Sequence, residues 1–253
     1  MWDPSLYLRF GDQRAQPCLD LIQKIGVADP ACAVDLGCGP GNSTTALRAR
    51  WPRARIIAVD NSPAMLDDAR RSDPEVEWIE ADIARWRPAQ PVDLIFSNAA
   101  FQWVPDHRSL LPGLVRCLRA SGFLAVQIPY HLHSPAHHAI EELCAEPPWR
   151  TWLQPVPRPF EILEPEDYYR ILRPMVRGLE LWQTTYLHIL ERPAAIVEWM
   201  RGTGLRPYLE RIPEAEREAF LRAYGEKVER LFPAQPDGRV LFPFPRLFFV
   251  AQV

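Results

Sequence analysis

The chain has 253 residues, of which 47% are hydrophobic and 24% are charged, which is the composition of an ordinary globular protein. Its formal net charge is -3, so the sequence lacks the basic surface that nucleic-acid-binding proteins need. The length fits one elaborated α/β domain or a domain with an added cap, and either can bury a sizeable core. We therefore expect a globular protein that does not bind nucleic acid.

The first residues do not match a signal peptide. Two aspartates and two arginines lie within the first 14 residues, where a signal peptide needs an apolar segment. No later apolar run approaches the roughly 20 residues of a membrane span. The five cysteines are scattered and none is spaced as C-x-x-C, so we expect neither a disulfide framework nor a cysteine zinc site. These features predict a cytoplasmic protein with no membrane partner.

Short apolar segments alternate with helical patterns in the first half of the chain, which is typical of a parallel sheet built from βαβ units. The predicted strands cover residues 31–36, 55–60, 76–82, 92–99 and 122–129. A helix is expected to begin at Ser62 and Pro63, which match the N-cap and N1 preferences, and to run to Arg70. Another helix is expected to begin at Asp106 and to continue until Gly122 stops it.

The pattern changes after about residue 130. The stretch PPWRTWLQPVPRPF is dense in proline, so we expect it to cross the surface as a loop or cap. Helices are predicted near 164–173, 193–202 and 214–231, and strands near 179–188 and 247–253. The second half therefore adds further helices and the last strands to the sheet of the first half.

The stretch DLGCGPGNST, from Asp35 to Thr44, places three glycines between a predicted strand and a predicted helix. Such a turn directs free backbone N–H groups and the positive end of the helix at a ligand. It lacks the Gly-Lys-Ser/Thr ending of a phosphate-binding P-loop. It also departs from the dinucleotide pattern G-x-G-x-x-G, because neither Asn42 nor Thr44 supplies the last glycine.

Acidic residues end three successive predicted strands. Asp35 would repel a pyrophosphate but attract the ammonium group of a bound amino-acid moiety. Asp60 ends the second strand, where a carboxylate can accept both hydroxyls of a ribose. Asp82 follows the third strand, where it can accept from an adenine amino group while Ile83 packs on the ring. Together these groups predict S-adenosylmethionine as the cofactor, although Asp60 and Asp82 can also cap the turns that follow them.

A set of motifs spans nearly the whole chain: PSLYLRF, DLGCGPGNST, SPAML, EADI, DLIFSNA with QWVPDH, LAVQ, TTYLH, TGLRPYL and FPRLFFVA. On these motifs the sequence resembles the class I S-adenosylmethionine-dependent methyltransferases, and within them the trans-aconitate 2-methyltransferase family. The resemblance implies an α/β fold with a Rossmann-like, doubly wound, mostly parallel seven-stranded sheet, whose last strand is antiparallel and whose helical insertions cap the active site. It also implies methyl transfer to a carboxylate of trans-aconitate or a related small polycarboxylic acid, with S-adenosylhomocysteine as the second product.

The resemblance implies one methyltransferase domain over residues 1–253. Residues 1–30 are expected to form a segment that covers the cofactor, and residues 131–178 and 189–240 to form the helical cap. Arg14 is expected to pair with the cofactor carboxylate. The other cofactor-binding residues implied by the motifs are Asp35, Gly37, Cys38, Gly39, Gly41, Asp60, Asn61, Met65, Ala81, Asp82, Ile83 and Asn98.

A carboxylate acceptor needs no catalytic base. Its reference pKa is about 4, so it is ionised near neutral pH and catalysis should consist of alignment alone. Arg206 and Arg246 are the expected anion anchors, since Arg246 lies among phenylalanines where a charge is costly to bury without an anion. Trp103 can place its aromatic face against the positively charged sulfonium of the cofactor. Further substrate-binding candidates are Tyr7, His131, Tyr186 and Tyr208. Each of these side chains also has a structural interpretation as a packed aromatic, a helix cap, an ion pair or a surface group.

One motif departs from the family pattern. The chain has Gln127-Ile128-Pro129-Tyr130-His131 where the family usually has Gln-Met-Pro-Asp-Asn. Two alternatives therefore stay open: a methyltransferase acting on a hydroxyl or carboxyl of another small metabolite, with His131 as the base for a hydroxyl, and a non-catalytic cofactor-binding subunit. The nearby histidines lack a spaced carboxylate or cysteine partner, so no metal site is expected. We expect a monomer or a small homo-oligomer.

Overall fold

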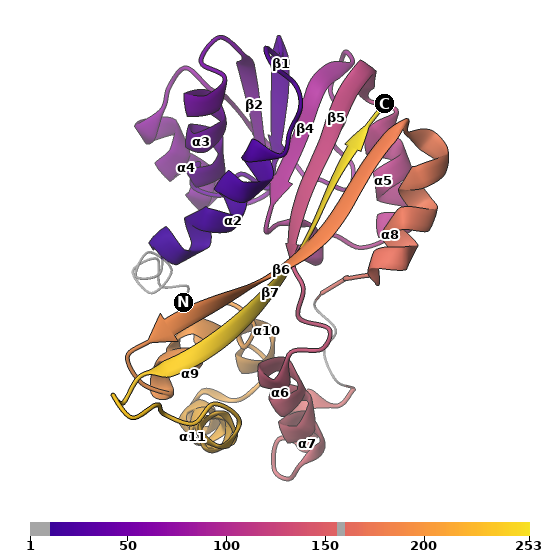
Figure 1. The fold of residues 1–253 in the computed structure, drawn as a ribbon. Helices are drawn as coiled ribbons and strands as arrows, with labels where there is room; N and C mark the ends of the chain where they lie inside the picture. The colour runs from indigo at the N-terminus through magenta and orange to yellow at the C-terminus, as the bar shows by residue number, and fades with distance from the viewer. Residues whose placement is uncertain (1–10, 156–159) are drawn as a thin grey trace. The chain divides into compact units, whose positions relative to one another are not determined.

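The computed structural model describes residues 11–155 and 160–253, with side chains from residue 15 onward. Within these residues seven strands form one sheet in the order β3-β2-β1-β4-β5-β7-β6 (Figure 1). The first five strands pair in parallel, and β7 runs antiparallel to β5. The predicted fold class, a doubly wound and mostly parallel seven-stranded sheet, is confirmed.

The strands span Cys32–Leu36 (β1), Arg55–Asp60 (β2), Glu77–Glu80 (β3), Val92–Asn98 (β4), Leu118–Pro129 (β5), Gly178–Leu190 (β6) and Val240–Gln252 (β7). The helices span Gly11–Gln23 (α2), Asn42–Arg50 (α3), Pro63–Ser72 (α4), His107–Val115 (α5), Pro135–Ala145 (α6), Arg150–Leu153 (α7), Pro165–Leu172 (α8), Ala194–Arg201 (α9), Arg206–Leu209 (α10) and Glu214–Leu231 (α11). Short 3-10 turns cover Phe101–Trp103 (η1) and Arg173–Met175 (η2). None of the described helices combines the length and apolarity that crossing a membrane requires.

The chain divides into two compact units. The sheet unit contains Arg14–Pro129, Phe160–Thr184 and Arg246–Val253, whereas the helical unit contains Tyr130–Pro159 and Thr185–Pro245. Strands β6 and β7 contribute residues to both units, and α8 belongs to the sheet unit. That residues 131–178 and 189–240 cap an active site stays a prediction.

The core of the sheet unit is built from strands that are covered on both faces. In Figure 1, α3 and α4 lie on one face of the sheet, and α5 and α8 lie together on the other. β1 is buried along its whole length, and Leu94, Ile95 and Phe96 in β4 are fully buried. Continuous apolar runs of this kind are what a parallel strand between two helical layers requires.

The helical unit has its own core. α11 packs against α6 and α9, and its buried residues include Phe220 and Tyr224. The Tyr224 hydroxyl donates to the carbonyl of Ala136 at 3.1 Å. In α6 the buried side chains recur at Ala136, Ile140 and Leu143, which is the spacing of one helix face.

The helix expected to reach Gly122 ends earlier. α5 begins after Asp106, as predicted, and the Asp106 side chain accepts from the Ser109 N–H. The helix ends at Val115, however, and β5 begins at Leu118. Pairing with β4 shifts between Val92 and Leu94, and a side chain at Gly122 would come within 2.9 Å of a backbone carbonyl. The glycine therefore serves a strand irregularity and does not stop a helix.

The last strand is longer than expected. The prediction began at Leu247 because Pro243 and Pro245 interrupt the preceding residues, but β7 begins at Val240. The period-two pattern of buried side chains at Val240, Phe242 and Phe244 decides the conformation, with Pro243 exposed between the two phenylalanines.

Candidate active site

The carboxyl ends of β1, β2 and β3 meet at one edge of the sheet. The backbone N–H groups of Gly37 and Cys38 both donate to the Val59 carbonyl, at 2.7 and 3.1 Å. The N–H of Ala81 donates to the Asp60 carbonyl at 2.9 Å. The three turns that carry the predicted cofactor-binding acids are therefore neighbours.

The turn after β1 requires its glycines. Gly37, Gly39 and Gly41 have φ angles of 77°, 55° and 96°, in the left-handed region that side chains rarely adopt. A Cβ on Gly37 would lie only 2.1 Å from Cβ of Ala100. Gly41 is the N-cap of α3, so the turn leads directly into the start of that helix. This is the backbone geometry that presents N–H groups to a ligand.

Asp35 is completely buried beside this turn. Its Oδ2 accepts from the hydroxyl of Ser43 at 2.7 Å and from that of Thr44 at 2.6 Å. Its Oδ1 is buried and accepts no hydrogen bond from the described residues. Burial raises the pKa of Asp35 to about 6, against the effect of the two hydroxyl donors. A cationic donor at Oδ1 would complete the site and stabilise the ionised form.

Asp60 links two turns. Its Oδ2 accepts from the Gly39 N–H at 2.9 Å and its Oδ1 accepts from the Ser62 N–H at 2.9 Å. Asp60 therefore does cap these turns, as its structural interpretation expected. A carboxylate has about four acceptor positions, so these bonds leave capacity for the hydroxyls of a ribose.

The turn after β3 places an acid and an apolar side chain together. Asp82 is exposed, and its Oδ1 accepts from the Ala84 N–H at 2.9 Å. Ile83 is buried, and its Cδ1 lies 3.2 Å from the position that a Cβ on Gly37 would take. Ile83 therefore lies against the glycine turn, where the base of a nucleoside can pack on it.

The other predicted cofactor residues differ in exposure. Cys38 is buried, and burial together with the nearby acids raises the pKa of its thiol. The sulfur of Met65 lies 3.5 Å from the position of a Cβ on Gly39, whereas Asn61 is exposed. The side chain of Arg14 lies outside the described residues.

Sequence reasoning missed one residue of this edge as a site residue. Asn98 ends β4, and its register partner in β5 is Gln127. Gln127 is 0% exposed, and neither its Oε1 nor its Nε2 has a hydrogen-bond partner among the described residues. The Asn98 Oδ1 is likewise buried without a partner there. The available signal was a polar residue inside the apolar run LAVQIP.

Two predicted substrate residues lie in the sheet unit. Arg246 in β7 is 5% exposed, which does not fit an exposed edge position. Trp103 in η1 is 48% exposed, and its ring lies 4.7 Å from that of Phe160. Trp103 is therefore available to a ligand, whereas Arg246 is a buried cation.

His131 lies in the helical unit. It stacks on His137, with ring centroids 4.0 Å apart, and the neighbouring Tyr130 is buried. Burial holds the pKa of His137 well below its usual range, and His131 lowers it further. Among the described residues, no group of three or more His, Cys, Asp or Glu side chains is placed to hold a metal ion.

The remaining substrate candidates also belong to the helical unit. Arg206 is exposed and its Nε donates to Glu210 at 2.8 Å, so it forms an ion pair, whereas its structural alternative was a cap on helix-end carbonyls. Tyr208 is buried in the core of the unit. Tyr186 is half-buried and stacks with the buried His188, at 6.5 Å between centroids. Tyr7 lies outside the described residues.

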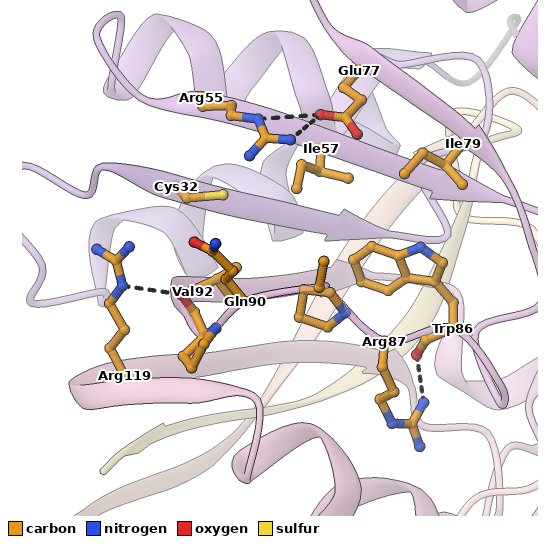
Figure 2. Close-up of a pocket in the computed structure, with 13 residues that line it drawn as sticks. Cys32, Arg55, Ile57, Glu77, Ile79, Trp86, Arg87, Gln90, Val92 and Arg119 are labelled. Carbon is orange, nitrogen blue, oxygen red and sulfur yellow. Dashed lines mark hydrogen bonds and ion pairs between the residues drawn. The ribbon is translucent and has the colours of Figure 1, made fainter.

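A pocket of about 410 Å³ lies at the opposite end of the strands (Figure 2). It is lined by Cys32, Arg55 and Glu77, which are the first residues of β1, β2 and β3. Its charged groups have protein partners: Arg55 Nε donates to Glu77 at 3.2 Å and Arg119 Nε donates to the Pro91 carbonyl at 3.0 Å. Ligands of open α/β sheets bind at the carboxyl ends of the strands, so this pocket is not the candidate active site.

The carboxyl-end residues fit S-adenosylmethionine. The buried Oδ1 of Asp35 needs a donor, and the ammonium of the methionine moiety is one. Asp60 keeps acceptor capacity for a ribose, and Ile83 offers an apolar surface to adenine. The fit rests above all on the Oδ1 of Asp35, which has no hydrogen-bond partner among the described residues.

Solved structures share this fold. The YcgJ protein from Bacillus subtilis matches with a TM-score of 0.60 and 14% identity, over 94% of this chain and 98% of that chain. The phosphoethanolamine N-methyltransferase 2 of Haemonchus contortus, in complex with S-adenosyl-L-methionine, matches with a TM-score of 0.57 and 16% identity, over 93% of this chain and 52% of that chain. At this identity the likeness concerns the fold alone.

Sequence comparisons are more specific. Residues 33–122 match the family model described as a methyltransferase domain. A relative from Azoarcus sp. (strain BH72), named trans-aconitate 2-methyltransferase, is 49% identical over 99% of this chain and 98% of its own. A relative of the same name from Klebsiella pneumoniae (strain 342) is 46% identical over 99% and 97%. The chain therefore belongs to the trans-aconitate 2-methyltransferase family of class I methyltransferases and is an enzyme whose cofactor is S-adenosylmethionine.

Proposed function

We propose that this enzyme transfers the methyl group of S-adenosylmethionine to one carboxylate of trans-aconitate and forms a methyl ester. The observation that carries the proposal is the end-to-end likeness to relatives named for this activity. The match to the methyltransferase family model covers only residues 33–122, and a match confined to these residues would support the cofactor but not the acceptor. Identity of 49% over 99% of the chain extends to the parts that differ between methyltransferases of different acceptors.

The chemistry makes few demands on the protein. When bound, S-adenosylmethionine supplies an electrophilic methyl group on a positively charged sulfur. Asp35 holds the ammonium, Asp60 the ribose, and Ile83 the adenine. An acceptor carboxylate is already ionised near neutral pH, so the protein has no proton to remove. The side chains act by binding and orienting the two molecules.

Alignment accounts for the rate. Holding an oxygen in line with the methyl carbon and its leaving group can lower the barrier by roughly 7 to 11 kcal/mol. A polycarboxylic acid offers non-reacting carboxylates by which it can be held, and Arg246 is a buried cation suited to one of them. Arg206, whose Nε donates to Glu210, stays a predicted anchor.

The test is methyl transfer from S-adenosylmethionine, labelled in the methyl group, to a panel of acids: trans-aconitate, cis-aconitate, isocitrate, citrate and itaconate. We expect base-labile label with trans-aconitate, at a higher kcat/KM than with any other acid. Transfer to none of these acids, by protein that still binds S-adenosylhomocysteine, would refute the proposed acceptor class. A higher kcat/KM with another acid would keep carboxyl methylation and replace trans-aconitate as the substrate.

A further inference from the structure

Three polar side chains share one face of the sheet, on neighbouring strands, and two of them, Gln127 and Arg246, are buried. Asn98 in β4 pairs with Gln127 in β5, and Gln127 pairs with Phe248 in β7. Arg246 is two residues before Phe248 and pairs with Pro129. Directly paired residues point to the same face, and so do residues two apart on one strand. Asn98, Gln127 and Arg246 therefore lie in a row across β4, β5 and β7, with strands about 4.8 Å apart.

The row continues the predicted cofactor site. Asp35 in β1 pairs with Phe96 in β4, two residues before Asn98, so Asp35 lies on this face as well. In β2, Asp60 is two residues after Ala58, the register partner of Asp35, and shares the face too. Across the sheet, the carboxylates on β2 and β1 are followed by the amides on β4 and β5 and then by the guanidinium on β7. Carboxylates suit the ribose and ammonium of the cofactor, and the guanidinium suits an anionic acceptor.

In this row, Gln127 is the residue whose two polar side-chain atoms are both buried without a hydrogen-bond partner among the described residues. Its amide is completely buried and has no hydrogen-bond partner among the described residues. The neighbours Val126 and Ile128 are buried and apolar, and the ring of Phe248 stacks on Trp182 with centroids 4.9 Å apart. An unpaired buried amide costs about 1 to 3 kcal/mol, and an apolar residue of similar size would avoid that cost. Stability therefore does not explain a glutamine at this position.

We propose that Gln127 binds the reacting carboxylate of the acceptor through its Nε2–H, between Asn98 on the cofactor side and Arg246, which holds a non-reacting carboxylate. The inference rests on the proposed function and names the residue that orients the nucleophile. A neutral amide fixes the direction of a carboxylate but leaves its negative charge available for attack, whereas a guanidinium would neutralise it. The new bond joins the carboxylate oxygen to the methyl carbon as the carbon–sulfur bond breaks, with its electron pair leaving on sulfur, and no proton moves.

The experiment uses the full-length protein and its Gln127→Leu and Gln127→Glu variants. We would measure the dissociation constant of trans-aconitate for protein saturated with S-adenosylhomocysteine, the dissociation constant of S-adenosylhomocysteine itself, the kinetic constants and the Tm. A hydrogen bond to a charged group corresponds to a change of about 10- to 150-fold, so Gln127→Leu should weaken acceptor binding and lower kcat/KM within that range. Gln127→Glu should lose more because it adds a repelling charge. Binding of S-adenosylhomocysteine should stay unchanged, and the Tm of the leucine variant should not fall.

Gln102→Leu is the matched control. Gln102 is also a buried glutamine whose Oε1 lacks a partner among the described residues, but its Nε2 donates to the Ala99 carbonyl at 2.7 Å, so its loss should lower the Tm. Acceptor affinity and kcat/KM of Gln127→Leu equal to those of the wild type would overturn the inference. So would a fall in Tm and in cofactor binding that accounts for the whole loss. The proposed function is judged separately, by whether the wild-type protein methylates trans-aconitate at all.

Discussion

At the scale of single residues, Asp35 is a carboxylate whose burial destabilises its ionised form. Its carboxylate is fully buried, one oxygen is held by two hydroxyls, and the other has no partner among the described residues. Burial raises the pKa to about 6. Because the folded-state pKa lies above the unfolded value, the ligand-free protein loses stability from this group as pH rises from about 4 to about 6. A bound ammonium would stabilise the ionised carboxylate and lower its pKa.

The same group should make cofactor binding depend on pH. In the proposed site the ionised form of Asp35 binds the ammonium, so affinity for S-adenosylhomocysteine should fall as pH is lowered from about 7.5 to about 5, by about tenfold for a pKa of about 6. Titration calorimetry at several pH values measures this. Asp35→Asn should bind weakly at every pH and show a flat profile. A wild-type profile as flat as that of the variant would contradict a role for the Asp35 charge.

Gly37 makes a second prediction at this scale. Gly37→Ala combines a left-handed φ of 77° with a Cβ placed 2.1 Å from Ala100, so it should destabilise the protein by about 2 kcal/mol or more and abolish binding of S-adenosylhomocysteine. Urea unfolding and calorimetry check both effects.

Two alanine variants separate the causes at Gly37. Gly238→Ala has a φ of 82° but nothing within 4 Å of its Cβ, so it isolates the backbone cost of about 1 kcal/mol. Gly225→Ala lies in α11 with its nearest neighbour 3.8 Å away and should stabilise that helix by up to about 1 kcal/mol. A loss of stability in Gly37→Ala no larger than that in Gly238→Ala would show that the clash with Ala100 does not matter.

At the scale of elements, α8 is fixed to the segment that follows β4. His107 Nε2 donates to the Phe101 carbonyl at 2.9 Å, and its Nδ1 accepts from the Tyr168 hydroxyl at 2.8 Å. The Tyr168 oxygen also accepts from the Leu163 N–H at 3.3 Å. Burial lowers the pKa of His107, which keeps the ring neutral and able to accept. This network joins α8 to η1, the turn that carries Trp103.

Removing one hydroxyl tests the network. Tyr168→Phe leaves a buried histidine nitrogen without its donor, so the free energy of unfolding should fall by about 1 to 3 kcal/mol. Tyr169→Phe is the matched control, because Tyr169 is 51% exposed and its hydroxyl loss should cost less than about 0.5 kcal/mol. Urea denaturation of both variants decides the point. Equal stability of the two variants would show that the bond to His107 contributes nothing.

Local patterns predicted most elements but not those decided by distant contacts. The Ser62–Pro63 start of α4 and the range of α11 followed from capping and periodicity. The start of β5 was wrong because Leu118 fits a helix period, whereas pairing with Val92 places it in a strand. The prediction likewise missed the first half of β7, where Pro243 and Pro245 lie.

The candidate site shows the same division. Asp35, Asp60 and Asp82 were found because each lies at or just after the end of its own strand in the sequence. Gln127 was missed as a site residue because its neighbours in the row, Asn98 and Arg246, come from other strands, and their register is not visible along the chain. Burial without a hydrogen-bond partner is also a property of the folded structure alone.

At the scale of the whole molecule, the chain forms two units with separate cores. The glycine turn, the acids and the amide row all belong to the sheet unit. Binding of the cofactor should therefore protect backbone amides in the sheet unit more than those in the helical unit.

Hydrogen exchange with mass spectrometry measures this difference between the two units. S-adenosylhomocysteine should slow exchange most in peptides that cover residues 36–44 and 58–66, because these peptides contain the Gly37–Gly41 turn and the Asp60 turn of the proposed cofactor site. Peptides from α11 should change least, since Phe220 and Tyr224 are already packed in the helical unit. Protection confined to α11 would contradict the placement of the cofactor site.

The most direct test of the account is the identity of the transferred group. Full-length protein would be incubated with trans-aconitate and S-adenosylmethionine carrying a carbon-13 methyl group, and the product followed by NMR before and after mild alkali. We predict one new methyl ester signal that alkali converts to labelled methanol. A methyl signal that survives alkali, or none while S-adenosylhomocysteine still binds, would contradict carboxyl methylation.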